Sequence, residues 1–154
     1  MTSGKRCPLI LMADDDVDDR LLVKEALSEA GVAHELRFAE DGLALLDYLK
    51  RAEAGVCGQA APRPELILLD LNMPLKDGRE VLRDIRSDRA LCRIPVVVFT
   101  TSKADTDIRQ MYELGANSFV TKPAAFKDLV ELMRRLFEYW FDTVHIPEAS
   151  PRTP

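Results

Sequence analysis

The sequence predicts a doubly wound α/β fold, in which helices cover both faces of a five-stranded parallel sheet. Short and nearly continuous apolar runs, such as residues 66–69 (LILL) and 96–99 (VVVF), are typical of parallel strands buried on both sides. Amphipathic segments of helical length separate these runs. Four of the predicted strands also end at a carboxylate, hydroxyl or ammonium side chain. The predicted strands lie near residues 8–13, 34–39, 65–70, 95–100 and 117–121.

The first helix is expected to follow the first strand directly. Asp16 is a suitable N-cap, because its side chain can accept hydrogen bonds from backbone N–H groups of the first turn. Asp18 and Asp19 place negative charge in that turn, where it complements the helix dipole. Gly31 is expected to end this helix as a C-terminal glycine.

A second helix and a long loop are predicted between the second and third strands. The pair Asp41-Gly42 opens the helix. Leucines at helical spacing form its predicted apolar stripe: Leu43, Leu46 and Leu49. The segment 51–64 contains glycine and proline and shows no periodicity, so we expect a surface loop there.

The remaining helices continue the alternation. Asp77-Gly78 is a turn that opens the third helix, and the fourth is expected over residues 104–114, ended by Gly115. The last and longest helix is expected from Ala124 to about Val144, followed by a tail that contains three prolines.

Composition limits the possible functions. A chain of 154 residues is large enough for one domain with its own core. The net charge of −5 argues against nucleic-acid binding through a broad basic surface, and no run of about 18 apolar residues could span a membrane. Residues 1–8 resemble neither a signal peptide nor an anchor. The widely spaced Cys7, Cys57 and Cys92 form no metal or disulfide pattern, so we expect a cytoplasmic protein.

The polar residues at the strand ends define a candidate site. Asp14-Asp15, Asp70, Thr100 and Lys122 follow four different strands, whose carboxyl ends meet at one edge of a parallel sheet. Carboxylates gathered there would repel one another without a cation, and an all-oxygen ligand set suits Mg²⁺. One aspartate could then accept a phosphoryl group, with Mg²⁺ and Lys122 neutralising charge and Thr100 offering its hydroxyl to a phosphate oxygen.

Each of these residues also has an ordinary interpretation. Residues 14–19 alone could be a solvated helix start, and Asp70 alone could be a turn residue that ends a strand. Thr100 is an ordinary β-former, and Lys122 could be a surface charge. Their joint placement at four strand ends is what favours a functional site.

The motifs resemble those of the receiver domain of two-component response regulators, over nearly the whole chain from about Pro8 to Phe141. The matching features are Asp14-Asp15, residues 69–74 (LDLNMP), Asp77-Gly78, residues 100–102 (TTS) and Lys122-Pro123. The resemblance implies a flavodoxin-like (βα)5 fold with strand order 2-1-3-4-5 and five helices. It also implies a receiver domain over residues 8–144 between tails 1–7 and 145–154, and phosphorylation of Asp70 by a sensor histidine kinase.

The resemblance implies a role for each site residue. Asp15 and Asp70 resemble direct Mg²⁺ ligands, Asn72 resembles the ligand that binds through its backbone carbonyl, and Asp14 resembles a ligand acting through water. Lys122 resembles the lysine that pairs with the phosphoryl group. The resemblance implies that the Lys122-Pro123 bond is cis, as in the family. Because a cis bond before proline costs little, it can aim the lysine.

Three residues near the site are expected to matter for signalling. In receivers, the resemblance implies that Thr100 moves toward the phosphoryl group and that the aromatic residue at Phe119 rotates inward behind it. Phe119 lacks the hydroxyl of the more usual tyrosine, and the alternative is that it belongs simply to the core. Thr101 beside the site could shield the acyl phosphate from water.

The apolar pattern of the last predicted helix indicates a protein–protein interface. Its apolar residues cover roughly 200° of the circumference, more than one core contact requires. We therefore expect a homodimer through the fourth helix, the fifth strand and the fifth helix. The alternative is that residues 143–147 fold back over the surplus.

Two other functions compete with a stand-alone regulator that acts by binding. A phosphohydrolase of the haloacid dehalogenase type would need a second carboxylate two residues after Asp70, where this chain has Asn72. An interaction module that takes no phosphoryl group is disfavoured by the complete set of site residues. The loop 51–64, residues 101–103 and the ending 139–142 (YWFD) are similar to regulators paired with bacterial phytochrome kinases.

Overall fold

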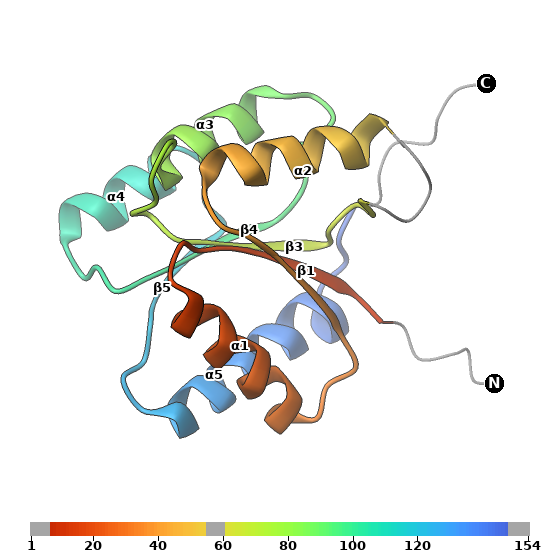
Figure 1. Cartoon of the computed structure of the whole chain (residues 1–154), viewed down its shortest axis with the longest axis vertical. Helices are drawn as coiled ribbons and strands as arrows, with labels where there is room; N and C mark the ends of the chain where they lie inside the picture. The colour runs from red at the N-terminus through yellow and green to blue at the C-terminus, as the bar shows by residue number, and fades with distance from the viewer. Residues whose placement is uncertain (1–6, 55–60, 148–154) are drawn as a thin grey trace.

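A computed structural model describes residues 7–54 and 61–147, which form one parallel sheet with helices on both faces (Figure 1). The sheet order is β2-β1-β3-β4-β5. The strands are β1 Leu9–Ala13, β2 Glu35–Ala39, β3 Leu66–Leu69, β4 Val96–Thr100 and β5 Ser118–Thr121. The helices are α1 Val17–Ala30, α2 Gly42–Ala54, α3 Gly78–Ser87, α4 Asp105–Glu113 and α5 Phe126–Phe137, and the π-helix η2 Glu138–Thr143 follows α5. The predicted fold class and strand order are confirmed.

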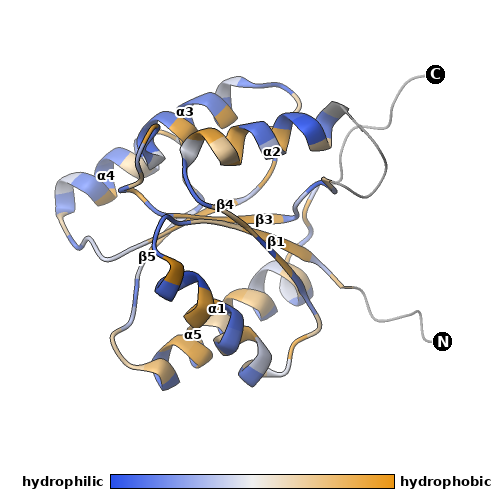
Figure 2. Ribbon diagram, viewed as in Figure 1, coloured by the Kyte–Doolittle hydropathy of each residue, from blue (hydrophilic) through white to orange (hydrophobic). Residues whose placement is uncertain are grey.

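Two apolar cores lie on opposite faces of the sheet. Helices α2, α3 and α4 cover one face, and α1 and α5 cover the other, with the apolar sides of the helices turned toward the strands (Figure 2). Within β1, Leu11 and Ala13 belong to the core under α2 and α3, whereas Ile10 and Met12 belong to the core under α1 and α5. This alternation follows from the two-residue repeat of a strand, so both faces of the central strands must be apolar.

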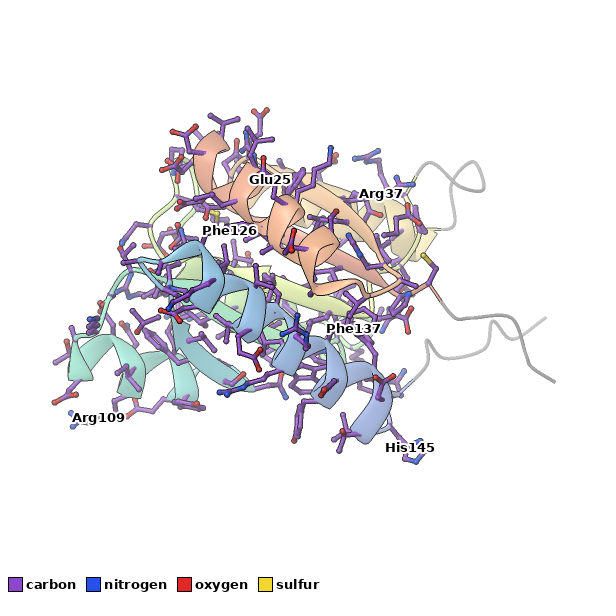
Figure 3. All side chains as sticks on the ribbon, turned by 90° about the horizontal axis from the view of Figure 1, so that it is seen from below. Glu25, Arg37, Arg109, Phe126, Phe137 and His145 are labelled. Carbon is purple, nitrogen blue, oxygen red and sulfur yellow. The ribbon has the colours of Figure 1, made fainter. Side chains whose placement is uncertain are left out.

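Helices α1 and α5 lie side by side on their face of the sheet (Figure 3). Val23 and Leu27 of α1 pack in the same core as Met133 and Phe137 of α5. The predicted cap of α1 is confirmed, because the Asp16 side chain accepts hydrogen bonds from the backbone N–H groups of the first turn. This cap fixes where α1 begins, immediately after the acidic end of β1.

The second helix differs from its prediction in two respects. It continues through Arg51 to Ala54, so the expected loop begins later, and most of the remainder, including Cys57, lies outside the described residues. Leu43 is 50% exposed, whereas Leu45 is fully buried. The apolar stripe is therefore Leu45, Leu46 and Leu49 rather than the predicted one. The spacing of three and four residues fits both sets, and only the packing against the sheet decides between them.

The last helix is also different from its prediction. It begins at Phe126 rather than Ala124, and its α-helical part ends at Phe137, after which the chain continues as η2 to Thr143. Most of the residues that widen the predicted apolar arc belong to the core under α1 and α5: Val130 and Phe137 are buried, and Leu132 and Phe141 are half-buried. Tyr139 stays 51% exposed.

The chain after η2 passes close to the beginning of β4, where Pro95 lines the same cavity as Ile146. The Val144 backbone N–H donates to the Tyr139 carbonyl at 3.0 Å. Ile146 and Pro147 line a cavity of about 390 Å³ together with Trp140. Among the described residues, none of the helices has the length and apolar character needed to cross a membrane.

Candidate functional site

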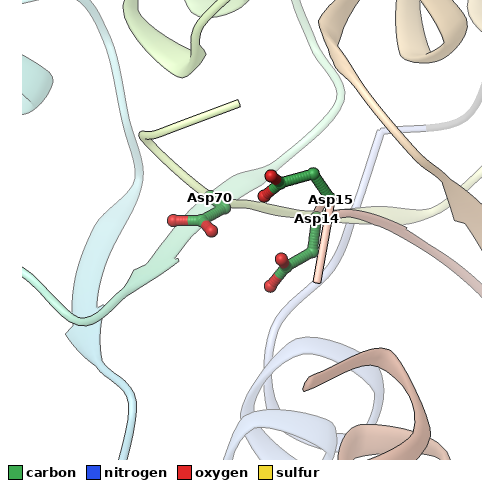
Figure 4. Close-up of side chains that lie close together, drawn as sticks. All are labelled: Asp14, Asp15 and Asp70. Atoms are coloured by element: carbon green, nitrogen blue, oxygen red, sulfur yellow. The ribbon is translucent and has the colours of Figure 1, made fainter. Parts of the chain in front are cut away.

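Three carboxylates meet at the edge where β1 and β3 end (Figure 4). Asp14 and Asp15 follow β1, and Asp70 follows the neighbouring β3, whose end is tied to β1 by a 3.0 Å hydrogen bond from the Asp70 backbone N–H to the Ala13 carbonyl. One carboxylate oxygen from each residue lies within 4.8 Å of the other two. Asp14 and Asp70 are buried, whereas Asp15 is exposed. Three acids at this separation repel one another and favour a bound cation.

The position of Asp70 is fixed by the loop that follows it. One of its carboxylate oxygens accepts a 2.7 Å hydrogen bond from the Leu71 backbone N–H. The Gly78 N–H in turn donates to the Leu71 carbonyl at 2.8 Å, so the start of α3 packs directly on the chain after Asp70. A Cβ atom on Gly78 would lie 2.5 Å from the Asp70 carbonyl oxygen, a distance that excludes any other residue without a shift of the backbone. The Asp77-Gly78 pair therefore holds the site as well as opening α3.

Lys122 brings the one ammonium group that contacts these acids. Its Nζ donates to Asp14 Oδ2 and to Asp19 Oδ2, both at 2.7 Å, and lies 3.3 Å from Asp70 Oδ2. The Lys122 backbone N–H is held by the Thr100 carbonyl at 2.7 Å, so the end of β4 places the lysine. The side chain is only 10% exposed. The carboxylates of Asp14, Asp19 and Asp70 thus share one cation, which leaves net negative charge at a largely buried site.

The pKa shifts agree with the excess of negative charge over positive charge at the site. Burial raises the pKa of the Asp14 carboxyl, and the hydrogen bond from Lys122 offsets the shift only in part. Burial alone would lower the pKa of Lys122, yet its hydrogen bonds to Asp14 and Asp19 and the charge of Asp70 raise it above its ordinary value. Lys122 is therefore a permanent cation at neutral pH. One such cation does not remove the cost of burying the Asp14 charge.

Thr100 is the one described residue with a buried side-chain oxygen that lacks a hydrogen-bond partner. It ends β4 and is completely buried. Buried hydroxyls nearly always have a partner, so an exception next to a cluster of acids suggests that the partner belongs to a bound group. The neighbouring Thr101 is exposed, and Phe119 on β5 is half-buried against the core under α2, α3 and α4.

The site residues come from four segments far apart in the sequence, and they match one family of proteins. Residues 10–134 match the family model of the response regulator receiver domain. The chain belongs to this family. The match covers more than half of this chain and includes all five predicted site residues: Asp14, Asp15, Asp70, Thr100 and Lys122.

Relatives of similar length support this assignment. The receiver domain is 43% identical over 141 residues to the response regulator Rcp1 of Synechocystis, covering 92% of this chain and 94% of the relative. It also resembles the crystal structure of the phosphorylated cyanobacterial phytochrome response regulator RcpA, with a TM-score of 0.82, 40% identity and coverage of 93% and 100% of the two chains. A crystal structure of the Mn²⁺-bound form of Rcp1 matches with a TM-score of 0.79, 42% identity and coverage of 92% and 99%.

One family feature predicted for this receiver domain is wrong. Peptide bonds among the described residues are all trans, so the bond between Lys122 and Pro123 is not cis. The trans form is the more stable isomer before proline by about 0.5–1 kcal/mol. Lys122 reaches Asp14 and Asp70 in this form, so a cis bond is not needed to aim the ammonium group.

Sequence reasoning missed one residue of the receiver site. Asp19 was assigned only to the first turn of α1, yet its carboxylate binds Lys122 as closely as that of Asp14 does. Short-range spacing offered no signal for this contact, because Asp19 and Lys122 are 103 residues apart and the contact depends on which side of α1 faces the site. Asn72 is exposed in the loop after Asp70, and its role as a carbonyl ligand remains a prediction.

The geometry suits a divalent cation. The ligand set is made only of carboxylate oxygens, which hard cations such as Mg²⁺, Ca²⁺ and Mn²⁺ prefer. Exposed Asp15 leaves the site open to solvent and to a phosphodonor, while Asp70 is held rigidly behind it. The arrangement therefore supports transfer of a phosphoryl group to a fixed carboxylate.

Proposed function

We propose that this receiver domain accepts a phosphoryl group on Asp70 from a sensor histidine kinase. The observation that carries the proposal is the convergence of two other carboxylates, Asp14 and Asp15, and one ammonium group on the buried Asp70, which the backbone holds in place. In the transfer, a carboxylate oxygen of Asp70 bonds to phosphorus as the bond from phosphorus to the kinase histidine nitrogen breaks, and that nitrogen keeps the electron pair.

The metal would be Mg²⁺, held by Asp15, Asp70 and the Asn72 carbonyl, with Asp14 acting through water. When bound, Mg²⁺ supplies the positive charge that neutralises the phosphoryl oxygens. Lys122 adds a fixed cation on the other side of Asp70, because its Nζ already lies 3.3 Å from the carboxylate. Together these charges oppose the repulsion that a phosphoryl group would meet in an acidic pocket.

Phosphorylation would be transmitted through β4 and β5. The Thr100 hydroxyl, which has no partner among the described residues, is free to donate to a phosphoryl oxygen. Its movement would open space for Phe119, which is half-buried and faces the core under α2, α3 and α4. The exposed Thr101 would shield the acyl phosphate from water. If Thr101→Ala leaves the dephosphorylation rate unchanged, the shielding role is wrong.

The partner kinase is proposed to be of the bacterial phytochrome type. The similar Rcp1 and RcpA proteins support this choice, since RcpA is described as a phytochrome response regulator. The composition and the isolated cysteines favour a cytoplasmic location. Phosphotransfer from a panel of purified sensor kinases tests the choice, and a phytochrome kinase should label the protein fastest.

A homodimer through α4, β5 and α5 is proposed as the form that signals. Tyr112 on α4 is 49% exposed, and its hydroxyl accepts a 3.2 Å hydrogen bond from the Phe119 backbone N–H, so this face is in contact with the switch residue. Sedimentation at micromolar concentration, with and without beryllofluoride as a phosphoryl mimic, should detect a dimer. A monomer under both conditions would contradict the dimer but leave the phosphoacceptor role intact.

The proposed function is tested by phosphotransfer with Asp70→Asn as the key variant. Asn keeps the shape of the side chain and removes the nucleophilic charge, so labelling should be lost completely while the far-ultraviolet circular dichroism spectrum stays unchanged. Asp47→Asn is a matched control, because Asp47 is well exposed and pairs with Arg51 within α2, and it should be labelled as fast as the wild type.

A further inference from the structure

A chain of polar contacts joins the start of α3 to the loop after β4. Arg79, the second residue of α3, donates from Nη2 to Asp107 Oδ1 and from Nε to Gln110 Oε1 on α4, both at 2.6 Å. The second oxygen of Asp107 accepts a 2.7 Å hydrogen bond from the Ser102 hydroxyl. We call Arg79, Asp107 and Ser102 the loop clasp.

The loop clasp holds the loop that follows β4. Ser102 lies two residues after Thr100, and its hydroxyl oxygen also accepts a 3.2 Å hydrogen bond from the Ala104 backbone N–H. Its carbonyl accepts a 3.3 Å hydrogen bond from the Thr121 hydroxyl on β5. Ser102 is therefore held at both its side chain and its backbone, while the Thr100 hydroxyl, two residues earlier, has no partner among the described residues.

The contacts of the clasp are stronger than those of a typical surface ion pair. Arg79 and Asp107 are 24% and 26% exposed, and both oxygens of Asp107 are engaged. The hydrogen bonds from Ser102 and Arg79 hold the pKa of Asp107 below its ordinary value, so the carboxylate is charged at neutral pH. A charged pair with several hydrogen bonds and limited exposure restrains its segments more than a solvated pair does.

This arrangement has a consequence for the proposed phosphoacceptor function, on which the following inference rests. If Thr100 turns toward a phosphoryl group on Asp70, the chain after Thr100 must follow, and the clasp resists that movement. We propose that Arg79 and Asp107 are positioning residues that hold the loop after β4 in its unphosphorylated arrangement and thereby set how readily Thr100 reaches the phosphoryl group. Neither residue is expected to touch the phosphoryl group itself.

The test is the affinity of the whole protein for beryllofluoride in the presence of Mg²⁺, measured by isothermal titration calorimetry. Arg79→Ala and Asp107→Ala should each bind the mimic about three- to tenfold more tightly than wild type, because the unswitched arrangement has lost its restraint. The double variant should be no tighter than either single one, because both remove the same restraint. Arg79→Lys keeps the charge and should lie between wild type and Arg79→Ala.

Arg51→Ala is the matched control, because Arg51 pairs with Asp47 within α2 and both side chains are well exposed. Its affinity should equal that of the wild type. A merely structural role of the clasp would weaken binding, since a loosened fold presents the site less often, so tighter binding is the diagnostic result. Unchanged or weaker binding by both clasp variants would overturn the inference while the wild type still binds. Failure of the wild type itself to bind would instead overturn the proposed function, and the inference with it.

Discussion

At the edge of the sheet where β4 and β5 begin, a half-buried arginine has a partner for nearly every N–H that it carries, whereas at the opposite edge the carboxylates outnumber the cation that they contact. The cation is Arg86 of α3, and burial lowers its pKa. Its guanidinium donates at 2.8–3.0 Å to four oxygens from two loops: the carbonyls of Gly115, Cys92 and Ile94 and the Asn117 side chain. These bonds tie together the two loops that lead into the strands.

At the opposite edge, several acids share one cation. The carboxylates of Asp14, Asp19 and Asp70 share the single ammonium group of Lys122, and the Thr100 hydroxyl has no partner among the described residues. A folded protein can bury charge for stability only when hydrogen bonds compensate its desolvation. The comparison teaches that the Arg86 edge is complete without a ligand, whereas the edge at Asp70 becomes complete only when a cation and an anion are added.

The largest expected effect lies at the Arg86 edge. Arg86→Met keeps the length of the side chain but removes the guanidinium donors from three carbonyls, so the free energy of unfolding should fall by about 3 kcal/mol; Asn117 Oδ1 keeps its hydrogen bond from the Val96 backbone N–H. Urea unfolding followed by circular dichroism measures this change. Arg83→Met, on the exposed side of the same helix, should change it by no more than about 0.5 kcal/mol. A loss below about 1 kcal/mol for Arg86→Met would mean that its hydrogen bonds do not hold the loops.

The next effect concerns metal addition. Mg²⁺ binds only the folded arrangement of the acids, so a concentration of 100 times its dissociation constant should raise the free energy of unfolding by about 2.7 kcal/mol. Thermal unfolding with and without Mg²⁺ measures the gain. Asp15→Asn should lose most of it. Asp16→Asn removes an equal charge next door while keeping a good N-cap, and it should retain the gain. Equal stabilisation of both variants would show that Asp15 is not a ligand.

The smallest effect is a gain in stability on mutation, opposite in sign to the effect of Arg86→Met. Thr100→Val replaces a buried hydroxyl without a partner by a methyl group of similar size, so the free energy of unfolding should rise by about 1 kcal/mol. The same change should weaken beryllofluoride binding, because no donor is left for the mimic. Thr100→Ser keeps the hydroxyl and should keep the binding. Destabilisation by Thr100→Val would indicate that the hydroxyl is already satisfied, and the contrast between the two edges would then fail.

Most of the fold could be predicted from local signals. Each strand begins only one residue later than predicted. The prediction comes this close because the apolar runs of a parallel sheet leave little ambiguity about which residues are buried. Helix details were less predictable. Leu43 and Leu45 fit the same helical pattern, and the change from α5 to the π-helix η2 has no counterpart in the spacing of the sequence. Such choices depend on packing between elements, which one segment of sequence does not contain.

The candidate site, too, could be predicted from the sequence only in part. The topology of the sheet determines that Asp14, Asp15 and Asp70 meet, so their convergence followed from strand ends alone. The bond of Asp19 to Lys122 depends on the rotation of α1 about its axis, and the trans bond before Pro123 depends on local backbone geometry. Neither is encoded in a short motif, and the resemblance to a family misled in the second case.

Mass spectrometry of the protein after phosphotransfer from a sensor kinase tests the central claim most directly. Tandem fragmentation should locate one added phosphoryl group on Asp70, with the label absent in Asp70→Asn. A phosphoryl group mapped to any other residue, or equal labelling of the Asp70→Asn variant, would contradict the assignment of this edge of the sheet as the phosphoacceptor site.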